Sequence, residues 1–165
     1  MFLLTDTCFW THLKELSDNV DIDLRPVLNK FRWGFTDEVQ TELSHQKLFP
    51  FVPVDQAFIV PIVEDELLFF KKKAPLIEEF DLADQTLIVS AERDNSIVLT
   101  DDGELFMQLL AMNLEAFSLP LFCLAMVKWD IIEKRVVSRA LRYWEEKGRY
   151  VIKDIKKGKI ILQQI

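Results

Sequence analysis

The sequence alternates between short apolar runs and segments with helical periodicity. Apolar runs of strand length occupy residues 2–5, 57–60 and 96–100, a further short strand is expected at 117–122, and helical patterns fill residues 7–16, 36–43, 64–72, 81–91 and 104–113. Neighbouring parallel strands need a crossover connection, which is usually a helix, so this alternation favours a parallel sheet. We therefore predict an α/β fold, a three-layer α/β/α arrangement with a mostly parallel central sheet.

The length and composition of the chain fit one folded domain, expected to cover residues 1–165. Of its 165 residues, 50% are hydrophobic and 28% are charged, and no linker divides them. Two cysteines, Cys8 and Cys123, are too few for a disulfide framework and favour a reduced, cytoplasmic setting. We expect no signal peptide and no membrane span, because polar residues interrupt the most hydrophobic stretch, 105–127.

The net charge of −7 is unevenly distributed. Residues 1–127 hold 9 basic against 22 acidic residues, whereas residues 128–165 hold 11 against 5. This distribution suits a protein that binds a metal ion with its acidic part and a polyanion with its basic end. The structural alternative is that the basic residues only form a solvated helix face. Residues 128–147 have an amphipathic helical pattern that Gly148 ends, while 150–165 fit either a hairpin or short helical turns. We expect residues 128–165 to pack on the domain as a basic helical extension.

Acidic residues stand where several predicted elements begin or end. The first strand ends at Asp6, and the strand at 96–100 ends in Asp101 and Asp102. Asp84 lies in the first turn of one predicted helix, and Glu42 lies about two turns into another. In an open α/β sheet the functional site lies beyond the carboxyl ends of the strands. We therefore predict that these four or five carboxylates share one edge of the sheet.

A cluster of carboxylates is unfavourable unless its charge is compensated. Like charges a few Å apart repel, so one carboxyl group takes up a proton unless a cation neutralises the cluster. Mg²⁺ and Mn²⁺ prefer oxygen ligands, and carboxylates that hold such ions with an activated water can cleave phosphodiester bonds. The local alternatives are a helix cap for Asp81, turn chemistry for Asp101 and helix-dipole contacts for Asp37 and Glu38.

Four short motifs contain these acidic positions. They are Leu3-Leu4-Thr5-Asp6-Thr7, then Thr36-x-x-Val39-x-x-Glu42-Leu43, then Asp84-x-x-Leu87-x-x-x-Ala91, and lastly Ile97-Val98-Leu99-Thr100-Asp101-Asp102. In this order, and on these expected elements, they resemble the PIN-domain family of nucleases, which includes VapC-like toxin ribonucleases. The resemblance is clearest over residues 2–127 and only general beyond residue 128.

The resemblance implies an activity as well as a fold. A PIN-type chain would be a Mg²⁺- or Mn²⁺-dependent endoribonuclease, a hydrolase that cuts single-stranded RNA. Carried over residue by residue, Asp6, Glu42, Asp84 and Asp102 would be the catalytic, metal-binding carboxylates, with Asp101 open as a fifth metal ligand. Thr100 would orient a carboxylate or a metal-bound water and so position the substrate. Two settings stay open, a toxin held by a small antitoxin protein and an RNA-processing enzyme.

The basic end of the chain supplies candidate contacts to RNA. Arg139 and Arg142 lie on the charged face of the 128–147 pattern, and we expect them to position the RNA backbone. The opposite stripe, from Trp129 to Trp144, suits the core or a subunit contact, which leaves a homodimer open. The basic run at 71–73 fits a solvated helix end or a further backbone contact.

Two other functions are weighed against the nuclease. One is a catalytically silent binding or scaffold module of the same fold, and the acids at all four family positions argue against it. The other is a phospho-acceptor or nucleotide-binding α/β domain, which would need a phosphate-binding loop. The chain has only 4 glycines and no Gly-rich loop, so the sequence does not favour that function.

Overall fold

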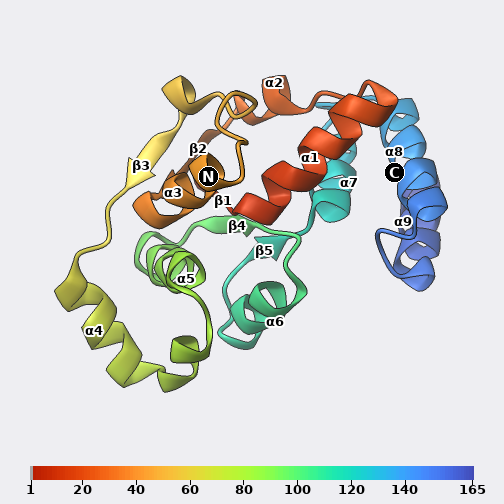
Figure 1. Ribbon diagram of the computed structural model, residues 1–165. Coiled ribbons are helices and arrows are strands. Elements are labelled where there is room, and N and C mark those ends of the chain that lie inside the picture. The colour runs from red at the N-terminus through yellow and green to blue at the C-terminus, as the bar shows by residue number, and fades with distance from the viewer. Residues whose placement is uncertain (1) are drawn as a thin grey trace.

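A computed structural model describes residues 2–165 and contains a five-stranded sheet whose strands are all parallel (Figure 1). In spatial order the strands are β3 (Phe58–Val60), β2 (Arg32–Thr36), β1 (Phe2–Thr5), β4 (Ile97–Leu99) and β5 (Ala116–Phe117). In the central pairs, Leu4 of β1 lies opposite Gly34 of β2 and Val98 of β4. The predicted single α/β domain with a parallel sheet is confirmed.

Helices follow the strands and flank the sheet. They are α1 (Thr7–Val20), α2 (Arg25–Leu28), α3 (Asp37–His45), α4 (Glu64–Lys73), α5 (Leu82–Asp94), α6 (Gly103–Ala111), α7 (Leu119–Lys128), α8 (Lys134–Lys147) and α9 (Ile152–Gln164), with short 3₁₀ turns at Val54–Gln56 and Pro75–Glu79. In Figure 1, α1 lies on one side of the sheet, and α5 and α6 lie on the other. Asp6, Asp81 and Asp102 accept hydrogen bonds from the first backbone N–H groups of α1, α5 and α6, which fixes where those helices begin.

Strand β2 was not predicted, although it lies next to the central strand. Its sequence, Arg-Trp-Gly-Phe-Thr, contains a glycine, which normally weakens a strand. Here the glycine is required by a close backbone approach. A Cβ atom at Gly34 would lie 2.0 Å from the carbonyl oxygen of Phe58 in the neighbouring strand. The backbone of β3 therefore leaves no room for a side chain at this position.

The prediction for residues 117–147 was wrong in its boundaries. Strand β5 ends at Phe117, and the residues expected to continue it begin α7, with Pro120 in the first turn, where its missing N–H costs nothing. The single helix expected at 128–147 is instead the end of α7 and a separate α8, because Asp130 adopts a left-handed backbone conformation between them. Gly148 ends α8 as predicted, with φ of 62°.

The C-terminal residues form one helix, which decides between the hairpin and the helical turns left open by the sequence. Helix α9 packs against α7 and α8, and α8 packs against α1. Ile155 and Leu162 of α9 are buried in the core. Among residues 2–165, no helix combines the length and the hydrophobicity that a membrane span requires.

Candidate functional site

Asp6 is a buried carboxylate at the carboxyl end of the central strand. Only 4% of its surface is exposed. Its Oδ1 accepts a hydrogen bond from the backbone N–H of Thr7 at 2.5 Å, and its Oδ2 accepts one from the hydroxyl of Thr100 at 2.7 Å. Burial raises the pKa of Asp6 to about 6, although both hydrogen bonds favour the charged form. Thr100 thus holds this carboxylate in place across the β1–β4 pair.

Glu42 reaches the same edge from α3. Its Oε2 accepts a hydrogen bond from the hydroxyl of Thr7 at 2.7 Å, so the residue that follows Asp6 also fixes the second carboxylate. The charge of Glu42 contributes to the raised pKa of Asp6, which places the two carboxylates within electrostatic reach. Sequence reasoning missed Thr7 as a site residue. The available signal was a buried hydroxyl directly after an acid at a strand end.

Asp84 lies within electrostatic reach of the other three carboxylates. It lies half-buried in the first turn of α5, and its pKa is raised to about 8. Burial is the largest cause, and the charges of Asp6, Asp81, Asp102 and Glu42 follow. The charges of carboxylates after β1, in α3 and after β4 therefore act on Asp84 in α5; that the four bind one metal ion stays a prediction.

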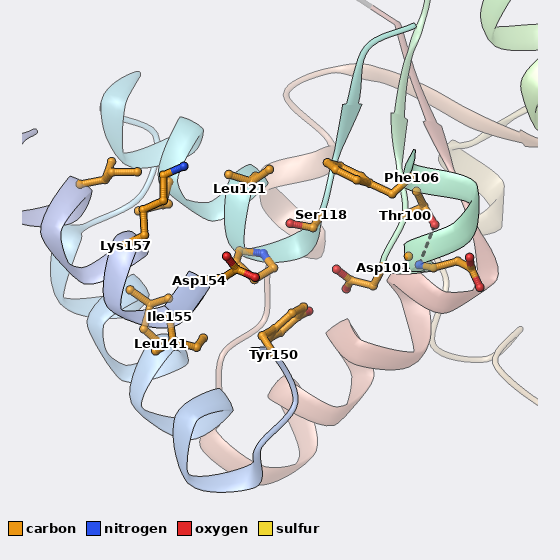
Figure 2. A pocket seen from close by; sticks show the side chains of 16 residues that line it. Thr100, Asp101, Phe106, Ser118, Leu121, Leu141, Tyr150, Asp154, Ile155 and Lys157 are labelled. Atoms are coloured by element: carbon orange, nitrogen blue, oxygen red, sulfur yellow. Dashed lines mark hydrogen bonds between the residues drawn. The ribbon is translucent and has the colours of Figure 1, made fainter. Parts of the chain in front are cut away.

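Asp102 caps a helix and also belongs to this group of carboxylates. Its Oδ1 accepts hydrogen bonds from the backbone N–H groups of Glu104 at 2.8 Å and Leu105 at 2.9 Å, which caps α6. Its own N–H donates to the Thr100 hydroxyl at 3.0 Å, the dashed line in Figure 2. Thr100 therefore connects Asp6 and Asp102 through one oxygen atom.

We expect the two roles of Asp102 to separate in a pair of variants. Asp102→Ala removes the cap and should cost about 1 kcal/mol, or roughly 2–4 °C in melting temperature. Asp102→Asn keeps an accepting oxygen and removes a repelling charge, so the melting temperature without metal should stay unchanged or rise. Thermal unfolding in a metal-free buffer measures both. A large drop for Asp102→Asn would mean that its charge is structural.

Cys8 lies close to the same cluster. Its pKa is raised to about 12, first by burial and then by the charges of Asp6, Asp102, Asp84 and Asp101. At neutral pH the sulfur is therefore a protonated thiol rather than a thiolate. This environment opposes nucleophilic catalysis by Cys8.

The donor set suits a hard divalent cation, although it is not a closed cage. All four side chains offer carboxylate oxygens, the ligands that Mg²⁺ and Mn²⁺ prefer. Within residues 2–165, no three acidic, histidine or cysteine side chains lie close enough together to form a ready-made metal site. Mg²⁺ usually binds through one or two carboxylates and keeps several waters, so such a cage is not required. The mutual repulsion at Asp84 is what a cation would relieve.

The structure does not support Asp101 as a fifth metal ligand. Its side chain is fully buried. One oxygen lies 2.9 Å from Nδ1 of His12 on α1, and the other accepts the backbone N–H of Leu119 at 2.9 Å. Asp101 therefore joins α1 to the start of α7. This correction follows from contacts between distant elements, which the local turn pattern did not contain.

Arg139 and Arg142 do not reach the carboxylates. The guanidinium of Arg139 donates to the carbonyl oxygen of Val20, at the opposite end of α1 from Asp6. With 14 residues, α1 separates these ends by about 20 Å. Arg142 is exposed one turn further along α8, next to Tyr143, whose hydroxyl donates to Glu15 in the middle of α1. The sequence showed the positive face of α8 but not its direction along α1.

A cavity of about 450 Å³ adjoins the carboxylate cluster. Thr100, Asp101 and Asp102 line one side of it, and residues of α6, α7, α8 and α9, with Ser118 and Tyr150 from loops, line the rest (Figure 2). Tyr150, in the loop before α9, points toward Asp101. Burial and the charge of Asp101 raise the pKa of Tyr150 above its ordinary range, so the hydroxyl stays protonated. Sequence reasoning missed this cavity because its walls come from segments far apart in the chain.

Comparisons with known proteins add no assignment. No protein-family model matches the chain, and no curated protein is significantly similar to it.

Proposed function

We propose that this protein is a PIN-type, Mg²⁺- or Mn²⁺-dependent endoribonuclease that acts in the cytoplasm on single-stranded RNA. The observation that supports the proposal is the raised pKa of Asp84, to which burial and the charges of Asp6, Asp102 and Glu42 contribute. The same four residues are the acidic positions of the PIN-like motifs. The parallel sheet with its acids at the carboxyl edge agrees with that family but is also found in other α/β proteins.

Each side chain then has a defined task. Thr100 and the N–H of Thr7 hold Asp6, while the Thr7 hydroxyl holds Glu42, so both carboxylates are oriented before any ligand binds. A bound divalent cation would supply Lewis-acid stabilisation of the phosphodiester and a water of lowered pKa. Asp84, with its pKa raised to about 8, would hold a proton at neutral pH, and the charge of a bound cation would favour its ionised form.

The test is cleavage of an unstructured RNA across a metal series. Purified protein is incubated with the RNA in EDTA, Mg²⁺, Mn²⁺ or Ca²⁺, and the products are separated by length. We expect internal cuts with Mg²⁺ or Mn²⁺ and none in EDTA. Cutting that is equal with and without metal would overturn the proposal. The Asp6→Asn variant, purified in the same way, identifies any contaminating nuclease.

A catalytically silent binding module is the second candidate. The observation in its favour is that no three potential ligands within residues 2–165 lie in metal-binding proximity. Such a module would bind single-stranded RNA without cutting it in any metal, and Asp6→Asn would leave the affinity unchanged or increase it. A nuclease would instead lose cleavage in that variant and keep binding.

The placement of positive charge yields a prediction about RNA affinity. Lys157 lines the cavity beside the carboxylates, whereas Arg139 lies at the far end of α1. Lys157→Gln should weaken RNA binding severalfold and lower the slope of log affinity against log salt by about 0.7, the value for one phosphate contact on a single strand. Arg139→Gln is the matched control and should change neither quantity. Binding titrations at several salt concentrations measure both quantities. A larger loss of affinity in Arg139→Gln than in Lys157→Gln would instead identify α8 as the RNA-binding face.

The biological setting is a further part of the proposal. A toxin would be held by a small antitoxin protein, and a short upstream reading frame that encodes a DNA-binding protein would support that setting. An RNA-processing enzyme would have no such neighbour. A homodimer is compatible with either, since large apolar side chains such as Phe69 and Leu76 are exposed on the α4 side of the molecule.

A further inference from the structure

The cavity beside the carboxylates has the composition of a site for an aromatic, partly polar ligand. Its volume of about 450 Å³ lies within the ~300–1,000 Å³ typical of small-molecule sites. Phe106 and Leu121 line it together with Tyr150, so much of the wall is apolar or aromatic. Asp154, Lys157 and Ser118 add a few polar groups (Figure 2). Apolar walls with few polar groups favour a flat ring that carries hydrogen-bonding edges.

The aromatic wall is held in place by its own contacts. The ring of Tyr150 meets Trp144 edge-on, with the ring centroids 5.2 Å apart, and meets His12 edge-on at 6.1 Å. His12 is in turn fixed by Asp101. A wall that is ordered before the ligand arrives loses little conformational entropy on binding.

Asp154 gives the cavity a chemical preference. It lies in the first turn of α9 and extends toward the side formed by Ser118 and Asp101 (Figure 2). Its carboxylate is exposed to solvent at the cavity wall, so a ligand in the cavity can reach it. An ionised carboxylate only accepts hydrogen bonds and can accept two side by side. Among the four RNA bases, guanine presents two adjacent N–H donors, on N1 and on the exocyclic amino group.

We propose that this cavity binds a guanine base of the RNA next to the phosphate that is cut, with Asp154 accepting its N1–H and amino hydrogens. The Ser118 hydroxyl, which lines the same cavity, would donate to the base carbonyl, and the base would stack against the aromatic wall. The occupant is inferred from the continuity of the cavity with the carboxylates, since Asp102 lines both and Thr100, which also lines the cavity, donates to Asp6. This inference rests on the proposed ribonuclease function and adds a base preference to it.

Nucleoside binding tests the subsite without any cleavage. Guanosine, inosine, adenosine, cytidine and uridine are titrated into the metal-free protein while the NMR signals of the Phe106 and Tyr150 rings are recorded. We expect guanosine to bind at least 10-fold more tightly than adenosine or uridine, and inosine, which lacks the amino group, to lie between them. Equal affinity for all five, or no shift of these signals, would overturn the subsite.

Three variants make the test specific. Asp154→Asn should remove the preference for guanosine, while Leu121→Trp, at a side chain that is 42% exposed, should fill the cavity and abolish binding of every nucleoside. Glu146→Gln, an exposed acid on α8, is the control and should bind like the unaltered protein. Circular dichroism verifies that each variant is folded. Retention of the guanosine preference in Asp154→Asn would contradict the proposed contact.

Mapped cleavage sites separate this inference from the proposed function. Metal-dependent cutting next to guanines that becomes indifferent to sequence in Asp154→Asn would support both. Metal-dependent cutting with the same sequence pattern in both proteins would leave the ribonuclease standing and overturn the subsite. Guanosine binding by a protein that cuts no RNA in any metal would support the subsite and overturn the ribonuclease.

Discussion

Replacement of Asp6 by asparagine is expected to lower the rate of metal-dependent RNA cleavage by more than ~100-fold. Loss of a residue that only supports a metal ligand typically costs about 10–100-fold, so loss of the ligand itself should exceed that range. The variant keeps one accepting oxygen, for the Thr7 N–H, and its amide NH2 can donate to the Thr100 hydroxyl oxygen in place of accepting from it. Single-turnover cleavage at saturating Mg²⁺ measures the loss.

Thr100→Val is the matched partner of this variant. It removes the hydroxyl that donates to Asp6 and accepts the Asp102 N–H, but leaves all four carboxylates in place. We expect a loss of about 10–100-fold that higher Mg²⁺ concentrations partly restore, because the ligands are present but poorly held. Asp6→Asn should not respond to Mg²⁺ in this way. Full activity in Asp6→Asn, with cutting still dependent on metal, would show that the carboxylate cluster is not the catalytic site.

The part of the site that lies on strand ends was predictable from sequence. Asp6 and Asp102 follow buried apolar runs, and the alternation of strands and helices predicted a parallel sheet, whose carboxyl ends lie on one edge. Asp84 and Glu42 required the additional inference that their helices begin at that edge. Local patterns and one topological rule indicated where these four residues lie, while their assignment to one catalytic site came from the family resemblance and stays a prediction.

Other features depended on contacts that no local pattern encodes. Strand β2 was missed because Gly34 weakens the strand signal, although the approach of Phe58 is the reason for the glycine. Asp101 follows a strand as Asp102 does, but His12 and Leu119 engage it from elements 89 and 18 residues away. The direction of α8 along α1, which removes Arg139 from the site, is likewise a result of packing.

In the absence of metal, Asp84→Asn is expected to raise the melting temperature by roughly 5 °C at pH 8 and to leave it unchanged at pH 4. The pKa of Asp84 is raised to about 8 in the folded protein, against an ordinary value of 3.8. Between these values the folded state binds more protons than the unfolded state, so stability falls as the pH rises. Asparagine is neutral at every pH, so the variant does not lose the stability that the ionisation of Asp84 costs the unaltered protein.

Screening by solvent determines how much the Asp84→Asn variant gains in stability. Asp84 is only partly buried, so solvent reduces its contribution below what the pKa alone implies. A net gain of about 1–2 kcal/mol corresponds to roughly 2–8 °C for a chain of this size. The fully buried Asp6, with its pKa near 6, remains in the variant and keeps a weaker slope between pH 4 and 6.

Metal supplies the decisive comparison for the Asp84→Asn variant. Mg²⁺ or Mn²⁺ should raise the melting temperature of the unaltered protein at pH 8, because the cation relieves the repulsion among Asp6, Glu42, Asp84 and Asp102. The variant has lost both a ligand and a repelling charge, so its melting temperature should rise less, and the melting temperatures of the two proteins should become similar at high Mg²⁺.

Asp81→Asn, at the neighbouring exposed cap, is the control and should show little pH-dependent gain in stability. Calorimetry from pH 4 to pH 8, with and without metal, measures all three proteins. An Asp84→Asn variant that is equally stable or less stable than the unaltered protein at pH 8 would show that the carboxylates do not repel one another in solution, and the argument for a cation at this edge of the sheet would fail.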